Sequence, residues 1–364
     1  MRQRFQHGAM LGSSLLSAAT VGRRSALAAL GGLALAPAAS AASSRRRVDW
    51  ADPADNLAAF GRLWASLDQP VIGAFHGLMY ARIPGRRLIP LFNYEGTGVI
   101  QARLEPDGRL AIKSRETGFF TALGSREVLE WWDNPLTGER VEVYHFYNDV
   151  LGGRIGRTIP TFVMAGGGRT RMNEGTSFPG PDGTAPFRLP IDFAGERAMV
   201  SWDYAHEYPN PVTPEGWPRA STGRVITPSE HFTFTAPRAL LEDPDVPSVP
   251  FSAGFTRVSE AWPFMRMGST PLAGLTLFGR MFSHKGLKGV EEVQPRLLAY
   301  IERHAPDYLT LPDGWPVGNA RIDTWSAYAM DVPPERPGHG WAWLGRERPV
   351  AAPPRTGLGA RSWR

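Results

Sequence analysis

Between residues 71 and 236 the chain repeatedly interrupts stretches of β-forming residues with short turn signals. One such signal is Pro106-Asp107-Gly108, which separates the runs 99–104 and 109–113. An Asp-Gly pair flanked by such runs is a strong hairpin signal. The connections are too short for the helical crossovers that parallel strands require. The sequence therefore predicts a mainly β structure with antiparallel strands.

Two predicted helices bracket these strands. The first is capped by Asp52 and Pro53 and continues at helical spacing to about residue 67, and the second covers residues 291–305. The chain also holds 40 glycines and 33 prolines among 364 residues, which disfavours a helical bundle. We predict a β-rich α+β fold, namely a large antiparallel β-barrel or barrel-like sheet with two bracketing helices.

Residues 1–41 have the layout of a twin-arginine signal peptide. Arg23-Arg24 precedes an apolar stretch at 27–36, and Ala39-Ser40-Ala41 has the small residues typical of a cleavage site. The apolar stretch is shorter than the ~20 residues that span a bilayer. We therefore predict export by the Tat machinery, a periplasmic or secreted location and no membrane span in the mature chain.

Composition suggests how the rest of the chain is divided. Residues 42–51 are predicted to be a linker, and residues 52–345 a single β-rich domain. The glycine- and proline-rich stretch 165–186 is a candidate internal boundary. Residues 346–364 are predicted to be a disordered tail.

Charge and cysteine content exclude several kinds of function. The signal segment carries four arginines and no acidic residue, so the 40 basic residues fall to 36, against 35 acidic ones, in the mature chain. A nucleic-acid-binding protein needs a concentrated basic face, which this pattern lacks. The absence of cysteine excludes disulfides, thiolate nucleophiles and zinc ribbons. We predict no nucleic-acid partner.

Several motifs occur in a characteristic order along the chain. They are Asp55-Asn56-Leu57, Ser114-Arg115-Glu116, the turn segment 133–139, the segment 259–268 and Gly289-Val290-Glu291-Glu292. This series resembles a bacterial family named domain of unknown function 1838, over roughly residues 50–310. Members often carry twin-arginine signals, so the resemblance implies export. It implies no activity, cofactor or catalytic residue.

Polar residues within predicted strands are candidates for proton transfer. In a predicted strand at 139–148, His145 shares an apolar face with Val141 and Val143. An unpaired polar group in such an interior costs about 1–3 kcal/mol, so His145 needs a partner. We predict that His145 and Asp149 approach His206 or His231. The predicted acid/base residues are His145, Asp149, His206, Glu207 and His231.

Two other interpretations of these residues remain open. Each residue can be an ordinary hydrogen-bonded member of a sheet or its rim. The three histidines can also bind a metal, but they are far apart in sequence, so we predict no metal site.

Four residues are candidates for ligand binding: Arg115, Trp132, Trp202 and Trp262. Tryptophan rings can line a cavity for an apolar or sugar-like ligand, and they can equally pack in a core. The segment Arg115-Glu116 can hold an anionic ligand or take part in an ion pair with a neighbouring strand.

Three functions are compatible with these patterns. The first is an exported enzyme that transfers protons, by hydration, isomerisation or hydrolysis, on a small apolar substrate. The second is a non-catalytic periplasmic carrier, and the third is an envelope protein that binds protein partners. An enzyme predicts histidine and carboxylate in one pocket, a carrier predicts an apolar pocket without them, and a partner-binding protein predicts an exposed aromatic patch. The sequence does not identify a cofactor.

Overall fold

The computed structural model describes residues 46–159, 162–163, 169–172, 185–268, 272, 274–315 and 324–336. All of them belong to one compact unit. Its helices are α1 (Pro53–Trp64), α2 (Arg238–Glu242), α3 (Pro295–His304) and α4 (Thr324–Asp331). No helix in these ranges is both long enough and apolar enough to cross a membrane.

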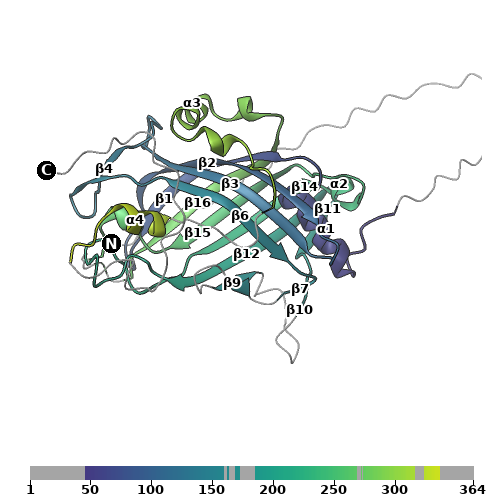
Figure 1. Cartoon of the computed structure of the whole chain (residues 1–364), viewed down its shortest axis with the longest axis horizontal. Helices are drawn as coiled ribbons and strands as arrows, with labels where there is room; N and C mark the ends of the chain where they lie inside the picture. The colour runs from purple at the N-terminus through teal and green to yellow at the C-terminus, as the bar shows by residue number, and fades with distance from the viewer. Residues whose placement is uncertain are drawn as a thin grey trace, which may run out of the picture. The chain divides into compact units, whose positions relative to one another are not determined.

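One large antiparallel sheet dominates the structure (Figure 1). Its strands, in spatial order, are β6 (Phe146–Ile155), β3 (Leu110–Thr121), β2 (Ile89–Leu104), β1 (Val71–Arg82), β16 (Thr276–Leu287), β15 (Phe251–Ser259), β14 (Ser229–Pro237), β12 (Arg197–Pro209), β9 (Arg169–Met172) and β8 (Phe162–Val163). β11 (Ile191–Ala194) and β13 (Val225–Ile226) also pair with β12. The predicted mainly β, antiparallel architecture is confirmed.

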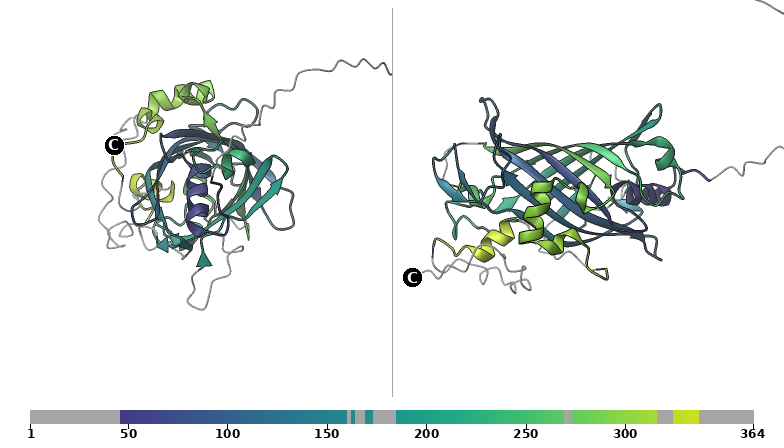
Figure 2. Two further views of the ribbon diagram at one scale, coloured as in Figure 1. Left: turned by 90° about the vertical axis from the view of Figure 1, so that its right-hand side faces the viewer. Right: turned by 90° about the horizontal axis from the view of Figure 1, so that it is seen from above.

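Two small ribbons accompany this sheet. β4 (Trp131–Asp133) pairs with β5 (Arg140–Glu142), and β7 (Thr158–Ile159) pairs with β10 (Ala185–Pro186). Among the described strands, no pairing joins β6 to β8, so closure into a barrel stays a prediction. The sheet nevertheless curls strongly, and α1 lies within the curl at one end (Figure 2).

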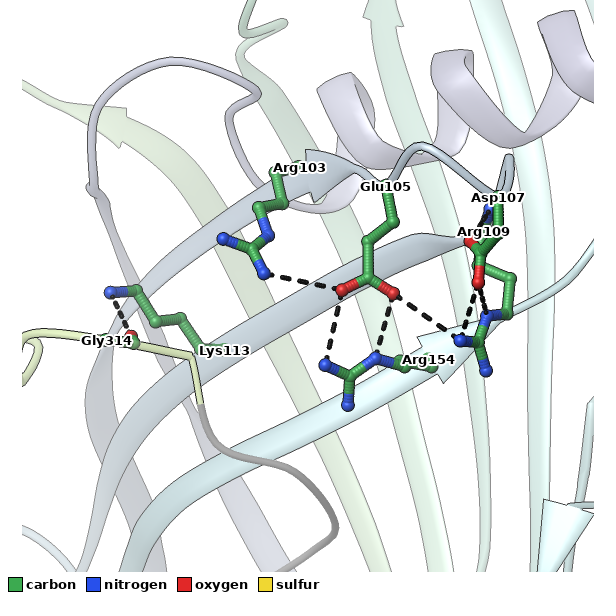
Figure 3. A network of polar contacts seen from close by, with 7 residues as sticks. All are labelled: Arg103, Glu105, Asp107, Arg109, Lys113, Arg154 and Gly314. Carbon is green, nitrogen blue, oxygen red and sulfur yellow. Dashed lines mark hydrogen bonds and ion pairs between the residues drawn. The ribbon is translucent and has the colours of Figure 1, made fainter.

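The predicted hairpin at Pro106-Asp107-Gly108 is the β2–β3 turn, with Leu104 opposite Leu110. Gly108 has a φ of 81°, a left-handed conformation that favours glycine. The Glu105 carboxylate fixes this turn to β6, because it accepts a hydrogen bond of 2.8 Å from Arg154 Nε (Figure 3). This hydrogen bond is the main reason that the pKa of Glu105 is lowered.

Helix α1 is built much as its sequence predicts. The Asp52 side chain accepts a hydrogen bond from the Ala54 backbone N–H at 2.9 Å, and Pro53 occupies the first turn. The helix ends at Trp64, about one turn before the predicted end. Phe60 projects into the core and stacks on Trp202, with ring centroids 4.2 Å apart.

Helix α3 begins at Pro295, later than the predicted residue 291, because residues 290–292 form a separate 3-10 turn. It covers the outer side of the sheet, where Tyr300 contacts Phe119 of β3 at 5.2 Å. The short helices α2 and α4 were not predicted. α2 is only five residues long, which gives no room for a helical repeat of apolar residues.

The predicted continuous strand at 139–148 is wrong. β5 ends at Glu142 and β6 begins at Phe146, and the three residues between them have no strand conformation. Val143, Tyr144 and His145 are all buried, so the two-residue alternation that placed His145 does not hold there. The break exists because this segment crosses from the small β4–β5 ribbon to the edge of the large sheet.

Other predicted segments lie partly or wholly outside the described residues. They are the signal segment 1–41, the first part of the linker 42–51, most of the boundary candidate 165–186 and the tail 346–364. These assignments stay predictions.

Candidate functional site

A cavity of about 290 Å³ lies within the curl of the large sheet. Its walls come from α1 and from strands as far apart in the sheet as β6 and β12. Strands that are distant along the sheet can share one cavity only because the sheet curls around it. The large apolar lining residues are Trp64, Phe75, Ile100, Ile112, Phe146, Ile155, Phe232, Phe251 and Phe255.

The aromatic walls are already packed against one another. Phe232 stacks on Phe255 with centroids 4.4 Å apart, and the edge of Trp64 meets Phe232 at 5.3 Å. Position 96 also requires a glycine, since a Cβ there would lie 2.0 Å from the Thr117 carbonyl oxygen and 2.5 Å from the Phe75 ring. The cavity is therefore bounded by rings with little freedom to collapse into it.

A row of polar side chains crosses the cavity wall. Tyr204 of β12 lies opposite Glu230 of β14, and Glu230 lies opposite Arg257 of β15. Arg257 and Glu230 form an ion pair, with only 11% and 16% of their side chains exposed. Burial alone would lower the pKa of Arg257, but the negative charge of Glu230 contributes to a net rise. Arg257 therefore stays charged.

Tyr204 is a neutral member of this row. Burial raises the pKa of its hydroxyl, and the charges of Glu230 and of Glu116 on β3 raise the pKa further. A phenol with a raised pKa keeps its proton at neutral pH and can donate a hydrogen bond to a ligand.

His206 follows Tyr204 by two residues, so both side chains point to the same face of β12. The two rings lie nearly parallel, with centroids 5.7 Å apart and an angle of 10°. His206, Glu116 and Glu230 all line the cavity. One cavity thus contains two histidines, His206 and His284, and two carboxylates, which are the residue types that proton transfer uses.

Among the four predicted acid/base residues whose side chains the structure describes, His206 is the one that lines this cavity. His145 is buried elsewhere, with its ring 5.3 Å from Phe119 and 5.9 Å from Tyr300. Its Nδ1 accepts a hydrogen bond of 3.3 Å from the Phe120 backbone N–H. His145 therefore belongs to the aromatic cluster beneath α3.

The other three predicted acid/base residues are placed as follows. Glu207 and His231 are exposed, and the His231 Nδ1 lies 3.6 Å from an Asp203 carboxylate oxygen. Asp149 belongs to β6, but its side chain is outside the described part of the structure. The proposed approach of Asp149 to a histidine therefore stays a prediction.

The four predicted ligand-binding residues do not line the cavity. Trp202 is fully buried, Trp262 packs 4.7 Å from Phe120, and Trp132 meets Phe92 at 5.1 Å. Arg115 donates a hydrogen bond of 2.8 Å to the Asp307 carbonyl, in the segment that follows α3. The tryptophan in the cavity wall is instead Trp64, at the end of α1.

Sequence reasoning missed Tyr204, Glu230, Arg257 and Glu116 as site residues. A sequence signal existed for Tyr204 and Glu230. Tyr204 lies two residues from both Trp202 and His206 on β12, and Glu230 lies two residues from Phe232 on β14, so each shares a strand face with these rings. Which face of each strand points inward was not evident. Within the described ranges, no group of three or more histidine, aspartate or glutamate side chains could hold a metal ion.

The family model described as "Protein of unknown function (DUF1838)" matches residues 68–329. The chain belongs to the DUF1838 family. The resemblance seen in the sequence motifs is thereby confirmed. The matched segment of this DUF1838 chain contains every strand that lines the cavity, from β1 to β16, while α1 precedes it.

Other comparisons add little. No protein with a curated description matches the chain. Rv2717c from M. tuberculosis is similar at 10% identity and a TM-score of 0.23, over 60% of this chain and 91% of that one. The Pseudomonas aeruginosa MucA/MucB complex is similar at 11% identity and a TM-score of 0.11, over 66% and 94%. Neither likeness is close enough to support an argument about fold or function.

Proposed function

We propose that the chain binds a small, mostly apolar molecule in this cavity, with a polar group of the ligand at the Tyr204–Glu230–Arg257 row. The observation that carries the proposal is the placement of this row, beside His206, in a wall whose other residues are mostly apolar. A sheet that closes into a barrel around the ligand is part of the same proposal.

The chemistry of the walls selects the ligand. Apolar surface gains about 25 cal/mol per Å² when it leaves water, so the aromatic walls favour an apolar body. A polar group that enters the same cavity needs a hydrogen-bonding partner, which the polar row supplies. A volume of about 290 Å³ is at the lower end of ligand cavities, which indicates a small molecule.

Proton transfer is the reaction that these residues support. The imidazole ring of His206 has one nitrogen that can accept a proton and one that can donate a proton. Tyr204 can donate a hydrogen bond to a ligand oxygen, and Glu116 supplies a second carboxylate in the same cavity. Hydration, isomerisation or hydrolysis of the bound molecule would use such groups. A carrier would use the same cavity without the reaction.

Filling the cavity is expected to abolish binding. Ser283 lines the cavity, whereas Ser252 is exposed on the outer face of β15. We expect Ser283→Phe to weaken binding of the fluorescent apolar amine N-phenyl-1-naphthylamine by about tenfold or more, because the added ring occupies ligand volume. The matched variant Ser252→Phe should bind as the wild type does. Equal binding by the two variants, measured by fluorescence titration, would contradict the proposal.

We also propose that residues 1–41 export the folded chain, supported by the order of Arg23-Arg24, the apolar stretch and the cleavage site. Replacing both arginines with lysine should leave the uncut precursor in the cytoplasm, because the twin-arginine pair is the recognised feature. Immunoblots of cell fractions measure this outcome. Normal amounts of mature protein outside the cytoplasm would show that another route is used.

A further inference from the structure

Lys285 is a buried lysine in the wall of the cavity, and its side chain takes no part in the polar row. The residue is 4% exposed, and no ion pair involves it in the described part of the chain. Its Nζ donates hydrogen bonds to the backbone carbonyls of Arg62 at 2.6 Å and of Ala65 at 2.5 Å. Both carbonyls lie at the C-terminal end of α1.

Each of these two carbonyls accepts a hydrogen bond from another donor as well as from the lysine. The Arg62 carbonyl also accepts a hydrogen bond of 2.9 Å from the Val249 N–H, and the Ala65 carbonyl accepts a hydrogen bond of 3.3 Å from the Ser248 hydroxyl. Capping the helix is therefore not a sufficient reason to bury a lysine, which is costly without a paired anion.

The surroundings favour the neutral amine. Burial lowers the pKa of Lys285 to about 7, and the nearby charge of Arg62 adds to this effect. A neutral amine has two N–H groups, and each can donate a hydrogen bond to one of the two carbonyls. Its lone pair then occupies the remaining tetrahedral direction, which is the arrangement of a nucleophilic lysine in an apolar pocket.

We propose that Lys285 forms a Schiff base with an apolar aldehyde or ketone bound in the cavity. This inference rests on the proposed ligand binding, since the carbonyl compound must enter the cavity. The Nζ lone pair forms a C–N bond to the carbonyl carbon, and the C=O π electrons move to oxygen. The two amine hydrogens leave with that oxygen as water, and a C=N bond results. No oxidant, reductant or cofactor takes part.

The chain offers an unusually clear test because it holds only three lysines, at positions 113, 285 and 288. Lys113 is a matched control. It is also buried, and its Nζ donates to two backbone carbonyls, those of Pro312 at 3.1 Å and Gly314 at 3.0 Å. It does not line the cavity. Lys288 is exposed and reports the ordinary reactivity of a surface lysine.

The experiment treats the full chain with benzaldehyde and sodium cyanoborohydride near neutral pH and maps benzylated peptides by mass spectrometry. We expect Lys285 to be labelled about tenfold faster than Lys288, because more of its amine is neutral. Lys113 should be labelled more slowly than Lys285. Lys285→Met should lose the fast labelling, and Lys113→Met should keep it.

Binding of N-phenyl-1-naphthylamine is measured on the same samples. If this probe binds but Lys285 is labelled no faster than Lys288, the Schiff-base proposal is overturned while the cavity proposal stands. If the probe does not bind, both proposals fail. Fast labelling that persists in Lys285→Met would also overturn the assignment.

Discussion

Replacing Glu95 with alanine is expected to lower the free energy of unfolding by about 3 kcal/mol. The Glu95 carboxylate is buried on the outer side of the sheet. It lies 2.7 Å from Arg126 and 2.6 Å from Arg296 of α3, and it accepts a hydrogen bond of 2.6 Å from Thr121. Removing the carboxylate leaves two arginines without their shared anion and releases α3 from β2. Because both arginines are about one-third exposed, water offsets part of the loss.

An exposed ion pair provides the control for this variant. Glu139 pairs with Arg219 at 2.5 Å, and both side chains are more than a third exposed. We expect Glu139→Ala to cost less than about 1 kcal/mol. Urea unfolding measures both variants. A Glu95→Ala variant as stable as Glu139→Ala would show that the buried carboxylate does not anchor α3.

The stability of the wild type relative to Lys285→Met is expected to rise by about 3 kcal/mol between pH 7 and pH 10. The pKa of Lys285 is lowered from 10.5 to about 7 in the folded state. Between these values the unfolded chain binds the proton more tightly, so protonation opposes folding. This cost is complete below pH 7 and disappears as the pH rises towards 10.5.

The comparison with Lys285→Met isolates the contribution of this lysine to the pH dependence of stability, since the other titrating groups are common to both proteins. Methionine has a similar length, and the Arg62 and Ala65 carbonyls keep their other donors, so the variant is expected to fold. Urea unfolding at several pH values gives the difference curve. A curve that is flat from pH 7 to pH 10 would mean that Lys285 titrates normally.

Local features of the fold were predictable from the sequence. The Asp-Gly turn, the Asp52 cap and the antiparallel strands all depend on residues close together in the chain. The break at residues 143–145 was not predictable, because it depends on where two sheets lie relative to each other. The start of α3 at Pro295 could have been inferred from the preference of proline for the first helical turn.

The site was predictable only in part. His206 was identified, and it lines the cavity with Glu230, 24 positions further along the chain. His145 was placed by an alternation that the strand break interrupts. The row of Tyr204, Glu230 and Arg257 depends on the register of three strands, which hydrophobic pattern alone does not specify. Lys285 gave no sequence signal, because its burial depends on the end of α1.

A crystal structure of the protein soaked with N-phenyl-1-naphthylamine would show whether the cavity binds a small apolar molecule. We predict electron density for the probe inside the curl of the sheet, against Trp64, Phe232 and Phe255, with its amine near the polar row. Density for the probe only on the outer surface, or a cavity filled by the protein's own side chains, would contradict this prediction.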